Sequence, residues 1–380
     1  MSVNSQLNVD PIRLWSSPSS RSYQEYSRYN DYFGPFYRTS QVIATLKPEF
    51  GNLDPELYHD VNGKEILFDQ VLNSSYWPEL MDLQREVSEA TIFCPDCADD
   101  GGPMNVTYTD VCLNPLAEKD DPTAGGCAIF SVFEYWENDW ERVERIHEYY
   151  KRGNKTHSIE TTYKDHFLYC TKTPSSLTDK LTSGETCMAA SGSPVFPFLA
   201  VGGYENEDYS TGKALILTFM VRNFVDRNAP QFKKAEIWET AFLNILKDKE
   251  AKKSFKYWNV AFFSERSIED VIDEASAADM IIFVISYILI FLYIMLALGK
   301  YESCKRLPID AKISLAISGI CMILLSAFAA VGVFGWAGIA SNLIVMEVVP
   351  FLLLAVGADN VFILIIRLSH ISPVKIISNK

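Results

Sequence analysis

Long apolar runs divide the chain into a first part without any and a last part that holds three. The runs are Met280–Leu298, Ile313–Phe334 and Ile344–Ile366. About 20 consecutive apolar residues allow a helix to cross the hydrocarbon layer of a bilayer. The pattern therefore predicts a folded region over residues 1–279 and three membrane-spanning helices after it.

Within the first part, three stretches repeat their apolar residues at helical spacing. They are Glu65–Ala90, which Pro78 is expected to divide in two, Cys127–Lys151 and Pro230–Lys253. A proline ends a helix or starts a new one, because it lacks a backbone N–H and clashes with the preceding turn.

Three other stretches are rich in β-branched and aromatic residues and predict strands: Thr39–Leu46, Ala214–Arg222 and Phe255–Phe263. Ser267 and Asp270 form a capping-box-like start of a last helix that runs towards the first span. The order strand, two helices, strand, helix, strand is typical of an α+β layer. The expected fold is thus an α+β domain followed by an α-helical transmembrane region with three spans.

Charge differs sharply between the two parts and predicts the topology. Residues 1–279 carry 27 Lys+Arg against 44 Asp+Glu, whereas residues 280–380 carry 7 against 4. The loop between the first two runs holds four basic residues, Lys300, Lys305, Arg306 and Lys312, and the next loop holds none. Because basic loops stay in the cytosol, residues 1–279 are expected on the lumenal or extracellular side.

Six of the eight cysteines fall in the first part: Cys94, Cys97, Cys112, Cys127, Cys170 and Cys187. An even number suits disulfides in an oxidising compartment. The CPDC motif that opens the series also has the spacing of a redox or zinc site. Its acidic neighbours disfavour a reactive thiolate, and the later cysteines lack zinc-ligand spacing. Disulfides are the favoured interpretation.

Three N-glycosylation sequons, at Asn73, Asn105 and Asn154, also lie in the first part. Glycans are attached to such acceptors only on the lumenal side of the membrane. Their position agrees with the charge rule.

Enzymatic signatures are missing from the sequence. The five histidines show no HExxH spacing and no obvious carboxylate partner, and no GxSxG, P-loop or GxGxxG motif occurs. The acidic balance argues against nucleic-acid binding. We therefore expect neither an enzyme nor a bound cofactor or metal.

The third apolar run contains four polar or helix-breaking residues, Glu347, Pro350, Asp359 and Asn360. A carboxylate at mid-membrane costs about 2.5–3.5 kcal/mol on insertion scales, so its presence calls for a function. Proline removes a backbone hydrogen bond and kinks the helix, and such a kink in a membrane often lines a cavity or pathway. The pattern favours transport. The alternative is a helix whose neutral acids are hydrogen bonded inside a bundle.

The chain opens MSVNSQLNVDPIRLW, without a signal peptide or an upstream span. A disulfide-bearing region of this size needs one or the other to reach the lumen. We therefore expect an interior part of a longer protein or a truncated product.

Several motifs together resemble the Niemann–Pick type C membrane sterol transporter family, over nearly the whole chain up to about Arg367. In the third run, EVVPFLLLAVGADNVFIL is similar to a helix of that family's sterol-sensing domain. The other similar segments are LWSSPSS (14–20), YFGPFYRTSQVI (32–43), DHFLYC (165–170), GSPVFPFLAVGGY (192–204), ERSIEDVIDEAS (265–276) and ISYILIFLYIMLALG (285–299).

The resemblance implies a domain plan and disulfide pairs. Residues 1–279 would be the middle lumenal domain, with a porter-like, ferredoxin-like core related to bacterial permeases. Residues 280–367 would be the first three helices of a sterol-sensing domain, and 368–380 a divergent tail. The implied pairs are Cys112–Cys127 and Cys170–Cys187, which leaves Cys94–Cys97 as a pair peculiar to this sequence.

The resemblance also implies partners and site residues. The family docks a small soluble lumenal sterol carrier through two loops, which correspond to the neighbourhoods of Pro48–Asn62 and Lys151–Thr162. The second loop reads THSIETT here, where the family has adjacent phenylalanines. Pro350 matches the family's sterol-site proline, and Glu347 and Asp359 match its ion-coupling acids.

The function implied is part of an intracellular cholesterol transporter that accepts sterol from the carrier and moves it into or through the membrane. The expected location is the late endosome or lysosome, or, for a paralogue, the plasma membrane of absorptive cells. The alternatives are a Patched-like sterol-sensing receptor and a non-functional truncated product.

Overall fold

The computed structural model describes residues 7–8, 16–17, 19–98, 101–116, 126–150, 158–182, 184–227, 229–268, 313–337 and 341–342, with scattered helical residues between 270 and 293 and between 349 and 367. The chain divides into two compact units. One is Arg28–Ser267, and the other combines Met1–Ser27 with Ile268–Lys380.

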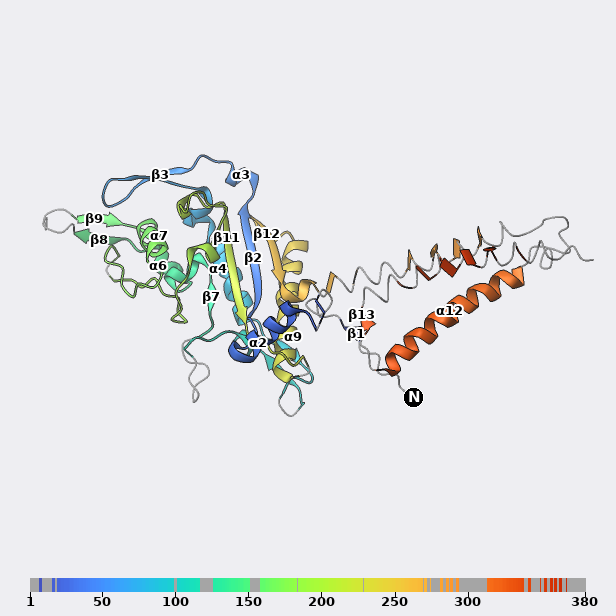
Figure 1. The fold of residues 1–380 in the computed structure, drawn as a ribbon. Coiled ribbons are helices and arrows are strands. Elements are labelled where there is room, and N and C mark those ends of the chain that lie inside the picture. The colour runs from blue at the N-terminus through green and yellow to red at the C-terminus, as the bar shows by residue number, and fades with distance from the viewer. Residues whose placement is uncertain are drawn as a thin grey trace, which may run out of the picture. The chain divides into compact units, whose positions relative to one another are not determined.

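An antiparallel sheet forms the centre of the larger unit (Figure 1). Its long strands are β2 (Arg38–Leu46), β11 (Ala214–Val221) and β12 (Trp258–Ser264), which confirms the three strands predicted from the sequence. The order is β10-β11-β2-β12, with β10 at Val201–Gly202 and β7 (Ile129–Phe130) also pairing with β11.

One face of this sheet is covered by α9 (Pro230–Ala251), the predicted third helix. Alternate residues of β2 are buried beneath it, as expected for a sheet with one face towards the core. The ring of Trp238 on α9 lies 4.7 Å from that of Tyr108 and 6.1 Å from that of Phe219, centroid to centroid. Tyr108 begins α5 (Tyr108–Val111).

A buried ion pair joins the same helix to the sheet. Arg38 donates to both carboxylate oxygens of Glu239, at 2.7 Å each, and Glu239 is fully buried. A bidentate geometry of this kind offsets part of the cost of removing both charges from water.

The helix predicted over Glu65–Ala90 is wrong in its first half. That half contains β4 (Glu65–Phe68) and two 3₁₀ turns, η1 (Gln70–Leu72) and η2 (Ser74–Tyr76), and only α4 (Pro78–Glu89) is helical. The side chains of Asp69 and Asn73 accept hydrogen bonds from backbone amides two residues on, so each starts a new short turn. Pro78 lies at the start of α4, as expected.

The helix predicted over Cys127–Lys151 is also wrong. The stretch divides into β7, η3 (Val132–Trp136), α6 (Trp140–Glu144) and β8 (His147–Tyr150). Glu137 and Asn138 adopt φ values of 53° and 54°, a left-handed conformation that ends the first turn. Asp139 then caps α6. The apolar residues recur at helical spacing because they enter the core from successive short turns.

Three β-hairpins project from the core, and the sequence predicted none of them. They are β3 (Glu56–His59) with β4, β5 (Ile92–Cys94) with β6 (Met104–Val106), and β8 with β9 (Ser158–Thr161). The remaining short elements of this unit are α3 (Pro48–Gly51), α7 (Tyr163–Lys172), α8 (Pro197–Ala200) and η4 (Tyr209–Thr211).

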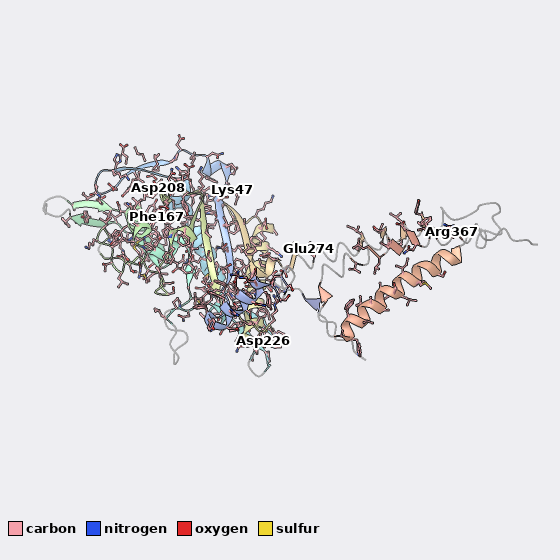
Figure 2. The ribbon with its side chains drawn as sticks, viewed as in Figure 1. Lys47, Phe167, Asp208, Asp226, Glu274 and Arg367 are labelled. Carbon is pink, nitrogen blue, oxygen red and sulfur yellow. A yellow bond between two sulfur atoms is a disulfide. The ribbon has the colours of Figure 1, made fainter. Side chains whose placement is uncertain are left out.

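Three disulfides fasten the connections of this unit: Cys94–Cys97, Cys112–Cys127 and Cys170–Cys187. All six cysteines except Cys127 are buried. The side chains around them fill a continuous core, in which Phe167 is fully buried (Figure 2). Cys112–Cys127 and Cys170–Cys187 are the pairs that the family resemblance implied, and Cys94–Cys97 is the remaining pair, which was expected to be peculiar to this sequence.

A short helical segment begins where β12 ends. The Oγ of Ser264 accepts from the backbone N–H of Arg266, and the Oγ of Ser267 accepts from that of Ser264. Helical residues follow from 265 onwards. The helical segment therefore starts a few residues before the predicted start at Ser267. Ser267 lies within the segment, and its side chain accepts a hydrogen bond from the backbone N–H of Ser264.

In the other unit, α12 (Ile313–Trp336) lies over the second predicted span. β1 (Leu7–Asn8) pairs in parallel with β13 (Ser341–Asn342). Counted over the described residues, no helix is both long enough and apolar enough to cross a membrane. The three spans stay a prediction. Gly357 packs closely on α12, since a Cβ there would lie 2.6 Å from Ile323 Cδ1.

Candidate docking site between two hairpins

The base of the second hairpin (β8–β9) is fixed by the start of α7, which follows β9 directly. Thr162 and Asp165 form a capping box: the Thr162 hydroxyl accepts from the Lys164 amide at 3.4 Å, and the Thr162 amide donates to Asp165 Oδ2 at 3.0 Å. This arrangement satisfies amides that a helix otherwise leaves unpaired at its start. The capping box therefore fixes the direction in which α7 continues from β9.

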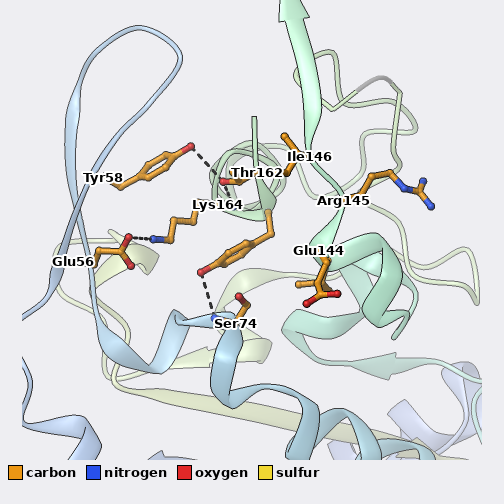
Figure 3. A pocket seen from close by; sticks show the side chains of 10 residues that line it. Glu56, Tyr58, Ser74, Glu144, Arg145, Ile146, Thr162 and Lys164 are labelled. Atoms are coloured by element: carbon orange, nitrogen blue, oxygen red, sulfur yellow. Dashed lines mark hydrogen bonds and ion pairs between the residues drawn. The ribbon is translucent and has the colours of Figure 1, made fainter. Parts of the chain in front are cut away.

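The first hairpin (β3–β4) is attached to the same helical turn (Figure 3). The hydroxyl of Tyr58 on β3 donates to Asp165 Oδ2. The ammonium of Lys164 lies 2.5 Å from Glu56 Oε1, also on β3. Two polar contacts thus connect one hairpin to the helix on which the other ends.

Lys164 is buried among aromatic rings. Its Nζ lies 5.3 Å from the ring centroid of Tyr58, 5.4 Å from that of Phe68 and 5.8 Å from that of Tyr163. The negative faces of aromatic rings attract a cation, and the attraction grows as water is removed. The rings and the Glu56 carboxylate together compensate the buried charge.

Burial changes the titration of the two groups that join the hairpins. It raises the pKa of Asp165, an effect that hydrogen bonds from Tyr58 and Thr162 oppose. Burial also raises the pKa of Tyr58, and the bond to Asp165 adds to the rise. Tyr58 therefore remains a hydrogen-bond donor throughout the physiological range.

A pocket of about 550 Å³ lies between the two hairpin bases. Glu56 and Tyr58 line it from the first hairpin, and Arg145 and Ile146 line it from the start of the second. Figure 3 shows these side chains around the space, with Lys164 and Thr162 in its wall.

Apolar side chains are exposed on both hairpins, and those of the first hairpin lie on the face that points away from Glu56 and Tyr58. Leu57 and Leu67 are directly opposite each other on the first hairpin, and each is more than half exposed. Ile146 and Tyr150 are similarly exposed at the second. Exposed apolar residues with polar neighbours are typical of a protein-docking surface. The two loops expected to dock a carrier thus correspond to two structured hairpins, although residues 151–157 lie outside the described chain.

A buried histidine lies behind the pocket. His166 Nδ1 is 2.8 Å from Asp179 Oδ2, and its Nε2 is 3.0 Å from the carbonyl oxygen of Tyr135. The expectation that the histidines lack a carboxylate partner is wrong at this position, because the partner is thirteen residues away in sequence and meets it only on folding. The contacts give His166 a structural role.

The structure describes two of the four residues that the sequence singled out in the third apolar run. Asp359 and Asn360 are helical and exposed, whereas Glu347 and Pro350 lie outside the described residues. Among the sequons, Asn105 is exposed on β6, and Asn73 is half-buried with its Oδ1 bonded to the Ser75 amide. Asn154 lies outside the described residues.

Sequence reasoning missed the residues that join the two hairpins, namely Glu56, Tyr58, Lys164 and Asp165. One signal was available for α7, because Thr162 and Asp165 have capping-box spacing ahead of an apolar run. No local signal connects Tyr58 to Asp165, since 107 residues separate them.

Comparison with known families gives two matches, one in each part of the chain. The family described as "NPC1, middle luminal domain" matches residues 25–266. The family described as "Sterol-sensing domain of SREBP cleavage-activation" matches residues 308–379.

Similar proteins carry both regions. The chain is 36% identical over 365 residues to the NPC1-like intracellular cholesterol transporter 1 of Rattus norvegicus, covering 95% of this chain and 26% of the relative. It is 37% identical over 368 residues to the Homo sapiens protein of the same name, covering 96% and 26%. Similarity to protein patched homolog 3 of Caenorhabditis elegans is 34% over 99 residues, 26% of this chain and 7% of the relative.

The chain spans about a quarter of the length of these transporters. More than half of it matches the lumenal-domain family, and the matched region contains the sheet, the disulfides and both hairpins. The chain belongs to the NPC1 middle luminal domain family.

Proposed function

We propose that this chain is part of a sterol transporter, in which the exposed apolar residues of the two hairpins receive a small soluble sterol carrier. The carrier delivers sterol, and the membrane region accepts it through a sterol-sensing domain. The relatives named as intracellular cholesterol transporters support cholesterol as the sterol.

The observation that carries the proposal is the shared attachment of both hairpins to α7. Tyr58 and Glu56 bind the first hairpin to the helix turn that begins at the end of the second. Rigid surfaces lose less conformational entropy when they bind, so a preorganised pair of hairpins suits a folded partner. Leu57 and Leu67 supply apolar area at the surface.

An acidic compartment fits the electrostatics of the domain. Glu134 is buried, and burial raises its pKa to about 7, against opposing hydrogen bonds from Gln84 and the Ala190 backbone. A group with a raised pKa stabilises the fold when it is protonated, and therefore at low pH. This supports placement of the domain in the lumen of a late endosome or lysosome rather than at the surface of absorptive cells.

Glu347, Pro350, Asp359 and Asn360 belong to the proposal as a sterol-sensing and ion-coupling group. Intramembrane ionisable residues are costly and commonly mark transport pathways. Close packing of Gly357 on α12 supports a helix bundle at this place.

A receptor of the Patched type is less well supported. The Patched similarity covers 26% of this chain, whereas the similarity to the cholesterol transporters covers 95% or more.

The docking proposal predicts that Leu57→Asp weakens carrier binding at least tenfold. A charge in the apolar contact must be desolvated without a partner, and tenfold corresponds to about 1.4 kcal/mol. Binding of the cholesterol-loaded soluble carrier of the Niemann–Pick type C system to the full chain in nanodiscs can be followed by surface plasmon resonance at pH 5.5.

The matched control is Val225→Asp, which introduces the same charge at another exposed apolar residue. Its neighbour Asp226 lies at the far end of the domain from β3 (Figure 2). Equal binding by the Leu57→Asp chain and the unsubstituted chain would refute docking at this surface. Equal weakening by both substitutions would indicate a nonspecific charge effect and would also refute it.

A further inference from the structure

His166 on α7 is a buried histidine whose two ring nitrogens both face hydrogen-bond acceptors. Its side chain is 1% exposed, and that of Asp179 is fully buried. Nδ1 lies 2.8 Å from Asp179 Oδ2, and Nε2 lies 3.0 Å from the carbonyl oxygen of Tyr135 on η3. A carbonyl oxygen and an ionised carboxylate only accept hydrogen bonds. Both contacts are therefore satisfied together when the ring carries a proton on each nitrogen.

A neutral ring cannot keep both contacts, because it has a single N–H. Either the carbonyl oxygen of Tyr135 or Asp179 Oδ2 then loses its donor from the ring. The hydroxyl of Thr182 lies 3.2 Å from Nδ1 and donates to Asp179 Oδ2 at 2.9 Å. If this hydroxyl turns to an unprotonated Nδ1, Asp179 Oδ2 loses two donors at once. A buried acceptor without a donor is unfavourable, so loss of the proton weakens the attachment of Asp179.

A disulfide closes the loop that carries these partners of the ring. It joins Cys170 to Cys187, and we name the residues between them the disulfide loop. Asp179 is central to the described part of this loop: its backbone N–H donates to the carbonyl oxygen of Glu185 at 2.6 Å, and its carbonyl oxygen accepts from Gly184 at 2.9 Å. A weaker attachment of Asp179 therefore affects the loop around it.

The disulfide loop also contacts the second hairpin at the ends of both strands. Thr161, the last residue of β9, is fully buried and donates to the carbonyl oxygen of Leu181 at 2.8 Å. Arg145, which lies between α6 and β8, donates to Glu185 Oε1 at 3.0 Å. The base of this hairpin thus rests on the same loop that His166 holds.

Charged and titratable groups face His166 from α6, from β8 and from the disulfide loop: Arg142, Arg145, His147, Asp179 and Glu185. Glu185 is 3.0 Å from Arg145 and 3.9 Å from Arg142, between charged atoms, and Arg142 is also 2.9 Å from Glu137. Both arginines are thus paired with carboxylates. Burial lowers the pKa of His147, so that ring takes up its second proton only at lower pH. Asp179 is the carboxylate in direct contact with the His166 ring.

We propose that protonated His166 is a pH-dependent latch, which fastens the disulfide loop to α7 at acidic pH and loosens it at neutral pH. The charge of a histidine side chain changes between about pH 5 and pH 8. Local segments open while the rest of a fold stays intact, and the ends of this loop remain joined by the disulfide. The latch sets the rigidity of the second hairpin, whatever partner that hairpin binds.

Nuclear magnetic resonance of the ring nitrogens tests the latch in the full chain held in nanodiscs. Histidine labelled at its ring nitrogens is incorporated, and His59, His157 and His370 are replaced by glutamine. The remaining signals belong to His147 and His166, and His147→Gln distinguishes them. We expect a bonded proton on both nitrogens of His166 at pH 5.5 and on one of them at pH 7.5.

Either of two spectra would overturn the proposal. A single protonated nitrogen at pH 5.5 would place the shared proton on Asp179. Two protonated nitrogens at pH 7.5 would mean that the ring does not change its charge over this range.

Hydrogen–deuterium exchange measures the consequence for the loop. After correction for the intrinsic pH dependence of exchange, peptides from the disulfide loop should exchange at least fivefold faster at pH 7.5 than at pH 5.5, while peptides from α9 keep the same protection. The difference should persist in His147→Gln. Its loss in that variant would make His147 the controlling group, and equal corrected exchange at the two pH values would show that the loop is not latched by a proton.

Discussion

At the scale of single residues, the domain contains buried polar side chains that are hydrogen bonded to one another. Gln84 donates to Glu134 at 2.6 Å and accepts from Ser131 at 2.6 Å, so a carboxyl, an amide and a hydroxyl form one buried chain. Burial raises the pKa of Glu134 to about 7, well above its usual value of 4.5. The proton on this group therefore differs between a neutral and an acidic compartment.

We predict that the stability of the domain falls as the pH rises from about 4.5 to about 7, and that Glu134→Gln removes most of this dependence. Below 4.5 the carboxyl is protonated in both the folded and the unfolded chain. Between the two pKa values only the folded chain keeps the proton, so each increase in pH lowers the free energy of unfolding. The total is about 3 kcal/mol, since one pKa unit corresponds to about 1.4 kcal/mol.

Urea unfolding of the full chain in nanodiscs, followed by near-ultraviolet circular dichroism at pH 4.5, 5.5, 6.5 and 7.5, measures this slope. Glu141→Gln, at an exposed position, is the control and should leave it unchanged. An equally steep slope in the Glu134→Gln variant would show that another group is responsible.

At the scale of elements, the important feature is the joint formed by β3, β9 and α7. Sequence periodicity found the regular elements that pack over long distances, namely β2, β11, β12 and α9. It failed at the hairpins, because strands of four residues carry too few positions to establish a period of two. It failed again at η1 and η2, where side-chain caps divide an apparently helical pattern.

We predict that Tyr58→Phe loosens the first hairpin without unfolding the domain. The substitution leaves the buried Asp165 without one of its donors, and the loss of a hydrogen bond to a buried acceptor costs about 1–3 kcal/mol. Hydrogen–deuterium exchange of peptides that cover β3 and β4 should become at least fivefold faster, while peptides from α9 keep their protection.

Tyr150→Phe provides a matched control for that experiment. It removes an exposed hydroxyl whose bond to Glu148 Oε2 is 2.8 Å long, so exchange in the first hairpin should not change. If Tyr58→Phe also left the exchange of β3 and β4 unaltered, the joint would not depend on Tyr58.

At the scale of the whole molecule, a lumenal domain and a membrane region are combined in one chain. One family match falls in each region, and the relatives similar to both regions are named as cholesterol transporters. The charge pattern, the cysteine distribution and the apolar runs of the sequence predict the same division. In the proposed mechanism, the sterol-sensing and ion-coupling group that includes Asp359 connects docking of the carrier to movement of the sterol.

We predict that Asp359→Asn, made in the full-length protein that contains this sequence, slows sterol export at least tenfold. An amide has nearly the shape of the acid but cannot exchange a proton, so coupling to a proton gradient is lost while helix packing is retained. Efflux of labelled cholesterol from endosomal compartments measures the effect. Glu274→Gln, a like change ahead of the apolar runs, should be neutral, and unchanged export by Asp359→Asn would contradict a coupling role.

The sequence alone determined the class of the domain, its three main strands, its long helix α9 and the family. These follow from patterns that are local or additive along the chain: period, charge balance, cysteine count and short motifs. Tertiary structure decided which residues meet. The Tyr58–Asp165, His166–Asp179 and Arg38–Glu239 pairs depend on how separate segments fold together, and a buried charge acquires its partner only there.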